Sequence, residues 1–447
     1  MDYVPITDHD REVMLEKIGV SSVQNLLNIP RDVPRARLQL PPPLSEPELL
    51  DLCRQIALSN RSIDPKRSFL GAGAYSHYAP SIVRYIASRG EFLTAYTPYQ
   101  PEASQGTLQA MYEFQSLLCE LTGMDVANCS LYDGATAVAE ACLVALRETD
   151  RKKLILSSGL HPEYRQTVRT YFQHSDIEVI EAPLQSGTTD LDFLNSSVNS
   201  EVAAVVVQVP NALGLLEPVD AIEKTTHAKG ALFITSVNPV SLGILKPPGE
   251  YGADIVVGEG QPLGIDAAYG GPYLGLFACR QTLVRKMPGR VVGMTRDAHG
   301  RRGFVLTLQT REQHIRRAKA TSNICTNEAM MALAAAVYMA SHGQQGFREL
   351  AEQNLRKAHY ACEQLSKIPG VSPMFGKPFF NEFALEVPID PETLNRRLEA
   401  KGFLGGLPLA RWDAQWKRGW LVCATEVQTK ESIDAFAQAV AESCKDR

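Results

Sequence analysis

The sequence predicts an α/β protein in which a mostly parallel β-sheet is wrapped by helices. Between about residue 66 and residue 330, short runs rich in β-branched residues alternate with helical stretches. These runs lie at residues 153–157, 177–181, 203–209, 231–236 and 254–257. Strands separated by helices are typical of parallel crossover connections. With 447 residues and 45% hydrophobic content, the chain can also bury a large core in two or three domains.

Three regions follow from the chain order. Residues 1–65 have helical apolar spacing interrupted by three prolines at 41–43, which predicts a helical arm that serves as an interface element. Residues 66–330 form the predicted large α/β domain. A polar loop at 321–326 then precedes an Ala- and Met-rich helix at 328–340 and leads into a smaller C-terminal α/β domain, residues 331–447.

Composition excludes several classes of protein. The formal net charge of -5 has no basic stripe, which disfavours nucleic acid and anionic membrane surfaces as partners. Nine cysteines without regular spacing argue against a disulfide framework and a structural metal site. The N-terminal segment has neither signal-peptide nor transit-peptide character, and no apolar stretch reaches the roughly 20 residues of a membrane span. We therefore expect a cytoplasmic protein that acts on small molecules or binds other proteins.

A polar, proline-restricted loop at residues 94–106 is the first candidate site. Two prolines limit its backbone while Tyr, Gln, Glu and Ser side chains offer donors and acceptors, as in a preorganised binding loop. A rigid surface turn would give the same pattern.

A turn at Asp133 and Gly134 that opens an Ala-rich helix is the second candidate site. Free N–H groups at a helix N-terminus attract anions, so Gly134, Ala135 and Thr136 could hold a phosphate group. Asp133 could equally act only as the helix cap.

Three segments of the sequence resemble the glycine decarboxylase P-protein family: TAYTPYQPEASQG (94–106), SLYDGATAVAEA (130–141) and LTLQTREQHIRRAKATSNICT (306–326). The resemblance extends over essentially the whole chain. In that family a long form has two similar halves, and a split form carries them as separate alpha and beta chains. This chain is similar to the N-terminal half, the alpha chain, which implies the fold-type I architecture of pyridoxal-phosphate enzymes.

The two groups that catalysis with pyridoxal phosphate requires are missing. The family's catalytic half has an acid at one strand end, which pairs with the pyridine nitrogen, and a lysine after the next strand, which forms the Schiff base. Here the first strand ends in Thr235-Ser236-Val237-Asn238, and the second continues as Gly258-Glu259-Gly260-Gln261. No lysine lies between Lys246 and Lys286. We expect no catalytic residue in this chain alone, and at most a relict phosphate site at Gly134, Ala135 and Thr136.

The resemblance implies a supporting role in a larger enzyme. It implies an alpha-two beta-two assembly in which the beta subunit holds pyridoxal phosphate, decarboxylates glycine and passes the aminomethyl group to the lipoyl arm of the H-protein. Fold-type I active sites lie at dimer interfaces, so this chain could contribute residues to its partner's pocket. The candidates are Tyr96, Thr97, Tyr99, Gln100, Glu102, Ser104, Gln105, Thr321, Ser322 and Asn323.

Two other interpretations remain open from the sequence. The chain could be a structural pseudoenzyme that only stabilises the beta subunit. It could also be a self-sufficient pyridoxal-phosphate decarboxylase or aminotransferase whose lysine lies elsewhere.

Overall fold

The computed structural model describes residues 5–27, 39–60, 62, 64–324 and 327–445, and it divides into two compact units, Met1–Ser62 and Ile63–Arg447. The first unit contains α1 (Asp8–Ile18), the 3-10 helix η1 (Val23–Leu26) and α2 (Glu46–Leu58). Thr7 and Ser45 begin the two α-helices through reciprocal capping boxes with Asp10 and Glu48. Neither helix buries a residue. Part of the predicted arm, residues 28–38, lies outside the described residues, and the predicted boundaries at 65 and 330 stay predictions.

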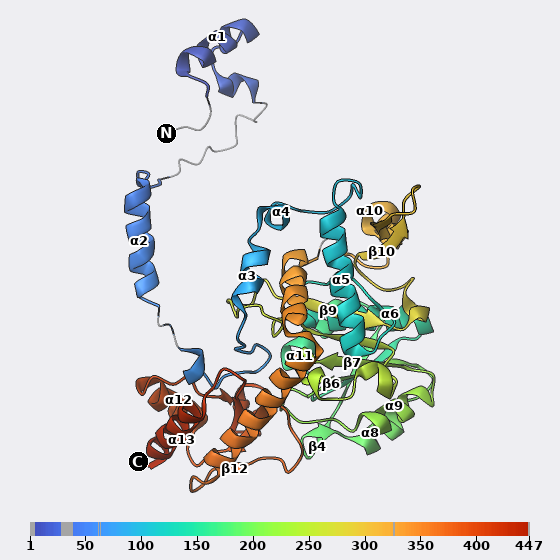
Figure 1. Ribbon diagram of the computed structural model, residues 1–447, viewed down its shortest axis with the longest axis vertical. Coiled ribbons are helices and arrows are strands. Elements are labelled where there is room, and N and C mark those ends of the chain that lie inside the picture. The colour runs from blue at the N-terminus through green and yellow to red at the C-terminus, as the bar shows by residue number, and fades with distance from the viewer. Residues whose placement is uncertain (1–4, 28–38, 61, 63, 325–326, 446–447) are drawn as a thin grey trace. The chain divides into compact units, whose positions relative to one another are not determined.

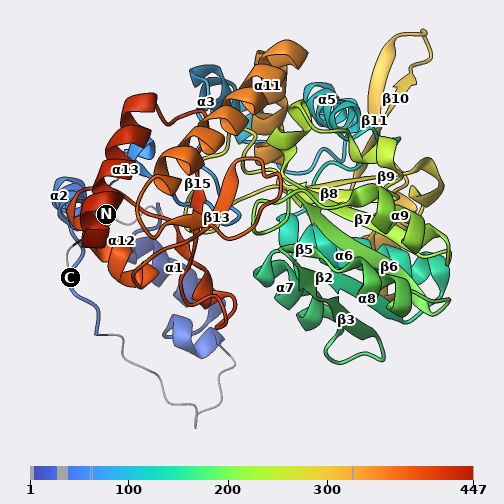
Figure 2. The same cartoon turned by 90° about the horizontal axis from the view of Figure 1, so that it is seen from below.

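The second unit is built on a seven-stranded sheet in the order β1-β9-β8-β7-β6-β2-β3 (Figures 1 and 2). Its strands are β1 (Val126–Ala127), β2 (Lys153–Ser157), β3 (Glu178–Ala182), β6 (Val202–Val209), β7 (Leu232–Val237), β8 (Ile255–Glu259) and β9 (Gly275–Cys279). The pairs from β3 to β8 are parallel, and β9 pairs antiparallel with both β8 and β1. The prediction of a mostly parallel sheet is confirmed.

Both faces of this sheet are buried. Along β6, Val205 and Val207 pack into one core cluster, whereas Ala204 and Val206 pack into another on the opposite face. Because side chains alternate between faces along a strand, a sheet covered on both sides needs nearly continuous apolar strands. This requirement explains why the β-branched runs in the sequence predict these strands.

Helices cover the two faces of the sheet. The elements between β1 and β9 are α6 (Gly134–Thr149), α7 (Pro162–Phe172), β4 (Leu184–Gln185), β5 (Thr188–Thr189), α8 (Leu191–Ser197), α9 (Val219–His227), η3 (Pro239–Gly243) and η4 (Pro248–Tyr251). Before β1 lie η2 (Pro65–Arg67), α3 (Ser81–Ala87), α4 (Gly90–Leu93) and α5 (Gln105–Thr122). Helix α6 packs on β6, β7, β8 and β9, so its N-terminus lies close to the strand ends that follow β8.

A hairpin and a long helix connect the sheet to the C-terminal part. After η5 (Gln281–Leu283) come the hairpin strands β10 (Val291–Arg296) and β11 (Arg302–Thr307), followed by η6 (Gln309–Arg311), α10 (Gln313–Arg316) and η7 (Arg317–Lys319). Helix α11 (Ala329–Ser366) is longer than the predicted helix at 328–340. It continues across a kink at Gly343, whose φ of 60° and ψ of -178° are not helical. Figures 1 and 2 show α11 running from the seven-stranded sheet to the C-terminal sheet.

The C-terminal part is a second α/β layer. Its sheet has the order β12-β13-β15-β14, made by β12 (Ser372–Pro373), β13 (Glu382–Glu386), β14 (Leu407–Pro408) and β15 (Gly419–Cys423). The helices α12 (Pro391–Ala400) and α13 (Lys430–Lys445), with η8 (Leu409–Arg411), complete it. Within the described part of the chain, no helix is long and apolar enough to cross a bilayer, and no three His, Cys, Asp or Glu side chains are grouped as metal ligands would be.

Candidate functional site

The loop before α5 exposes most of the side chains predicted to act in a partner's pocket. Tyr96 is 75% exposed and Tyr99 is 55% exposed, and Gln100 and Glu102 are also on the surface. The remaining candidates of this loop, Thr97, Ser104 and Gln105, are half-buried. The loop therefore presents large aromatic side chains outward, where a single folded chain gains little from them.

Gln105 has an internal structural role. Its Nε2 donates to the carbonyl oxygens of Pro101 at 2.6 Å and Phe304 at 2.9 Å, and its Oε1 accepts from the Phe304 amide at 2.8 Å. These bonds attach the first turn of α5 to β11. Gln105 thus positions the loop rather than facing outward from it.

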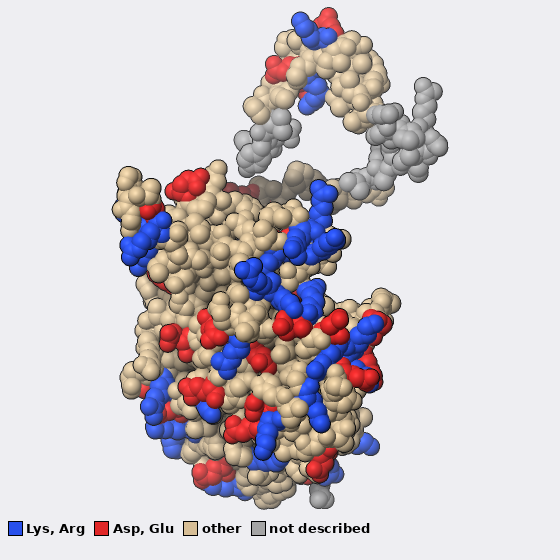
Figure 3. Space-filling model, turned by 90° about the vertical axis from the view of Figure 1, so that its right-hand side faces the viewer, with Lys and Arg blue, Asp and Glu red and all other residues tan. Residues whose placement is uncertain are grey.

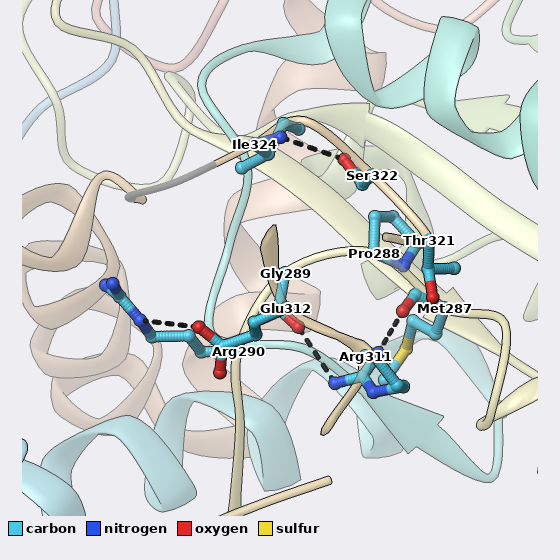
Figure 4. Close-up of a pocket in the computed structure, with 9 residues that line it drawn as sticks. All are labelled: Met287, Pro288, Gly289, Arg290, Arg311, Glu312, Thr321, Ser322 and Ile324. Carbon is cyan, nitrogen blue, oxygen red and sulfur yellow. Dashed lines mark hydrogen bonds and ion pairs between the residues drawn. The ribbon is translucent and has the colours of Figure 1, made fainter. Parts of the chain in front are cut away.

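Arg290 connects this loop to the second predicted segment. Its guanidinium lies 5.7 Å from the ring centroid of Tyr99 and donates to the Tyr99 hydroxyl at 3.4 Å. Its Nε lies 3.7 Å from Glu312 Oε2, and Arg290 is only 5% exposed. Arg290 and Glu312 line a small cavity together with Thr321 and Ser322 (Figure 4). The structure therefore brings Tyr99 and the 321–323 segment to one site.

Arg311 lines this cavity, and three backbone carbonyl groups hold its guanidinium in place. Its Nη2 donates to Gly289 O at 2.9 Å, its Nε donates to Leu308 O at 3.1 Å, and its Nη1 donates to Met287 O. Figure 4 shows the Arg311 guanidinium turned toward Met287. Thr321 N donates to Arg311 O at 3.2 Å, so the same residue also holds the start of the 321–323 segment.

The three predicted residues of that segment differ in exposure. Thr321 is half-buried, Ser322 is 8% exposed and Asn323 is exposed. Ser322 Oγ accepts from Ile324 N at 3.0 Å. Burial raises the pKa of Glu140 on α6, and the Ser322 hydroxyl opposes this rise. Asn323 is the exposed residue of the three.

The expected relict phosphate site is filled by the chain's own carboxylates. Gly134 N donates to Glu259 Oε2 at 3.0 Å, and Thr136 N donates to Asp133 Oδ1 at 2.7 Å. The Thr136 hydroxyl bonds Asp133 as well. Gly134, Ala135 and Thr136 thus form the first turn of α6, with the amides of Gly134 and Thr136 and the Thr136 hydroxyl already bonded.

A small cavity lies beside the end of β8. Gly73, Tyr75, His161, Ser236, Asn238 and Glu259 are among the residues that line a cavity of only about 20 Å³ at this place. Such a volume holds about one water molecule. His161 is buried there and caps α7, and burial lowers the pKa of its imidazole. None of the described residues that line this cavity is a lysine, so its lining does not supply the Schiff-base group that pyridoxal phosphate needs.

The two strand ends that would supply the acid and the lysine have other functions here. Asn238, after β7, accepts from Val240 N and caps η3. Gln261, after β8, is 1% exposed and bonds the backbone of Tyr75 through both its amide atoms, at 2.8 and 2.9 Å. Neither strand end offers a group for Schiff-base chemistry.

A second buried carboxylate, Glu382, is bonded to Tyr75, which lines the small cavity. Glu382 is 3% exposed, and it accepts from Tyr75 Oη at 2.6 Å and from Ala72 N at 2.5 Å. Burial raises the pKa of Glu382 to about 7, although the bonds from Ala72 and Tyr75 favour the ionised form. The group therefore binds a proton more tightly in the folded chain than in the unfolded chain.

We expect this group to make stability depend on pH between about 4.5 and 7. Because the unfolded carboxyl loses its proton near pH 4.5 and the folded one near pH 7, the free energy of unfolding should fall as pH rises through this window, by roughly 3 kcal/mol. Denaturant unfolding of wild type and Glu382→Gln at several pH values measures the effect. The variant should show a flatter dependence, whereas Glu349→Gln, at an exposed position on α11, should follow the wild type. Identical slopes for Glu382→Gln and wild type would contradict the assignment.

A basic hollow lies beside the cavity of Figure 4. We use this name for the hollow of about 380 Å³ lined by Arg147, Arg285, Lys286, Arg316 and Lys319, with Arg311 and Thr321 at its edge. Lys286 pairs with Glu148 at 2.6 Å, whereas the side chains of Arg285, Arg316 and Lys319 have no hydrogen bond or ion pair to any residue that the structure describes. Figure 3 shows Lys and Arg side chains gathered on the side that carries α6 and α10. Cations held together without counter-charges attract an anionic partner.

Sequence reasoning missed Arg290, Glu259 and Glu382. Each acts through a contact with a residue that is distant in the chain, and none lies in a recognisable spacing pattern. The sequence Met287-Pro288-Gly289-Arg290 offered one signal, a turn followed by a charged residue next to a strand. In the sequence, Glu259 stands out only as part of a segment without lysine.

Two solved structures with low sequence identity share the fold of this chain. A Lactobacillus brevis glutamate decarboxylase superposes with a TM-score of 0.69 at 14% identity, covering 93% of this chain and 96% of that one. A Burkholderia pseudomallei sphingosine-1-phosphate lyase gives a TM-score of 0.67 at 17% identity, covering 91% and 92%. At such identities the likeness concerns the fold alone. Together with the sheet order, it shows that the chain has the α/β fold of these two enzymes.

Closer relatives define the family. The family model for the glycine cleavage system P-protein matches residues 1–440. A crystal structure of glycine decarboxylase (P-protein) of the glycine cleavage system, in inhibitor-bound form, is 46% identical with a TM-score of 0.91, covering 99% of this chain and 100% of that one. The probable glycine dehydrogenase (decarboxylating) subunit 1 of Desulfitobacterium hafniense is 50% identical over 99% of this chain and 100% of that protein. Its counterpart in Chlorobium luteolum is 51% identical with the same coverage. The chain belongs to the glycine cleavage system P-protein family.

Proposed function

We propose that this chain is the alpha subunit of a two-chain glycine decarboxylase and has no catalytic activity alone. The observation that supports this most directly is the end of β8. In the catalytic half of the P-protein family, the Schiff-base lysine is expected just after this strand. Here that stretch contains Glu259 and Gln261, which are both buried and hydrogen-bonded within the chain. The pyridoxal phosphate of the assembled enzyme is then held by the beta subunit, where it acts as the electron sink for decarboxylation of glycine.

The alpha subunit's contribution is proposed to be the exposed loop and the segment joined to it by Arg290. Tyr96, Thr97, Tyr99, Gln100, Glu102 and Ser104 would face the partner's pocket, and Gln105 would keep the loop in place through β11. Thr321, Ser322 and Asn323 would approach the same pocket from the cavity of Figure 4. Side chains held on bonded elements can orient a substrate, which lowers the entropic part of the barrier.

The basic hollow supports a second contact, with the lipoyl-bearing H-protein. It shares Arg311 and Thr321 with the cavity that would open to the partner's pocket. Its unpaired cations Arg285, Arg316 and Lys319 would attract an acidic protein surface and guide its lipoyl arm toward that pocket. An alpha-two beta-two assembly is the proposed arrangement.

Glycine-dependent exchange of carbon dioxide tests this function. We expect exchange, with H-protein and pyridoxal phosphate present, from the mixture of alpha and beta chains and from neither chain alone. Exchange by this chain alone would contradict the proposal and favour a self-sufficient enzyme. Full exchange by the beta chain alone would reduce this chain to a structural partner.

A further inference from the structure

One carboxylate occupies the place at which an anion would bind to helix α6. Glu259 ends β8, and its Oε2 accepts from Gly134 N at 3.0 Å. Its Oε1 accepts from Gln261 N at 3.0 Å and from Leu274 N at 3.0 Å. Three backbone donors from separate segments therefore converge on a single side chain.

The local packing leaves no room for an external anion beside it. A Cβ at Gly134 would lie 2.5 Å from Tyr164 Oη and 3.0 Å from Glu259 N. The Thr136 amide and hydroxyl belong to the capping box with Asp133. The first turn of α6 is thus bonded to two carboxylates of its own chain.

Burial raises the pKa of Glu259 to about 7, and Asp133 adds to this rise, whereas the three backbone N–H groups favour the ionised carboxylate. A helix N-terminus has partial positive charge from its unpaired N–H groups and attracts anions, including phosphate. A carboxylate supplied by the chain satisfies these donors permanently and without a ligand. It also connects α6, the end of β8 and the residue before β9, which are elements of the sheet layer far apart in sequence.

We propose that Glu259 is a built-in replacement for a bound phosphate: its carboxylate holds the α6 N-terminus to the sheet and excludes pyridoxal phosphate and inorganic phosphate from the start of α6. The inference goes beyond the proposed function because it concerns this chain by itself. It holds whether or not the chain supports a beta subunit. Its failure is therefore distinguishable from a failure of the exchange experiment.

The test removes the carboxylate and offers a small anion in its place. Glu259→Ala leaves three buried N–H groups without an acceptor, which should lower the midpoint temperature of unfolding of the full chain by about 5–10 °C. Formate should restore about half of this loss, because a ligand that binds only the folded state raises its stability. Chloride at equal ionic strength should restore none. In equilibrium dialysis the double variant Arg316→Glu and Lys319→Glu, which removes two cations of the basic hollow, should bind neither inorganic phosphate nor pyridoxal phosphate.

Glu217→Ala provides the matched control. Glu217 is also buried, at 6% exposure, but it accepts from one backbone amide, Thr189 N at 2.9 Å, and from Asn211 Nδ2 at 2.8 Å. Its loss should destabilise the chain with less recovery in formate. Equal recovery in the two variants, no recovery of folded Glu259→Ala, or stoichiometric binding of either phosphate compound by the double variant of the basic hollow would overturn the inference.

A second variant covers the case in which Glu259→Ala does not fold. Glu259→Gln keeps the side-chain volume and an oxygen for Gln261 N and Leu274 N, but its amide Nε2 would face Gly134 N, so that two donors meet. Hydrogen exchange of the amides at the start of α6 should then be about tenfold faster than in the wild type. Unchanged protection at Gly134 would show that the carboxylate does not hold this turn.

Discussion

Replacing Tyr96 by Ala should lower the rate of glycine-dependent carbon dioxide exchange of the assembled alpha–beta enzyme by about 100-fold, because a group that positions substrate is lost. Tyr96 is 75% exposed and has no hydrogen bond to any described residue, so the fold of this chain does not need it. An exposed tyrosine on a loop held at Gln105 is well placed to act on a neighbouring subunit. The rate should fall at saturating glycine, which separates positioning from weaker binding.

Assembly must be followed alongside the rate. Size-exclusion chromatography of the mixture should give the same complex for Tyr96→Ala and wild type. Tyr171→Ala, which removes another exposed tyrosine from α7, is the matched control and should retain the full rate. Loss of assembly in parallel with the rate would assign Tyr96 to subunit packing, and an unchanged rate would remove this loop from the pocket.

Reversing two charges in the basic hollow should weaken the reaction with the H-protein. The double variant Arg316→Glu and Lys319→Glu should raise the KM for H-protein by roughly tenfold or more at low salt, with little change in kcat, because rim charges mainly affect encounter. Both side chains are exposed and unpaired among the described residues, so little stability should be lost. In the wild type the KM should rise with ionic strength, and in the variant this dependence should be weaker.

A second double variant controls for net charge. Arg348→Glu with Arg356→Glu changes the charge by the same amount on α11, where both arginines are exposed and pair with Glu352 at 3.3 and 3.1 Å. It should leave the KM for H-protein near the wild-type value. Equal effects of the two double variants would assign the change to overall charge and contradict a docking role for the basic hollow.

From the sequence alone, five of the seven strands of the large sheet could be predicted, β2, β3, β6, β7 and β8, whereas β1 and β9 could not. The β-branched runs at 153–157 and 203–209 were readable because a sheet buried on both faces needs apolar residues at successive positions. The absence of lysine between Lys246 and Lys286 needs no structure, since a missing residue type is a property of the sequence. The full length of α11 was not readable, because Gly343 interrupts the helical geometry without ending the element.

The residues that stand in place of the acid and the lysine make contacts that can be seen only in the folded chain. Glu259 meets Gly134 across 125 positions, and Tyr75 meets Glu382 across 307. Likewise, Arg290 joins Tyr99 to the cavity beside Thr321 and Ser322, although no spacing in the sequence relates these residues. Periodicity and spacing report on neighbours within one element, whereas these contacts depend on the order in which crossovers place strands and helix ends. The small cavity lined by Tyr75, His161 and Glu259 therefore follows from the packing of the sheet layer and not from any one segment.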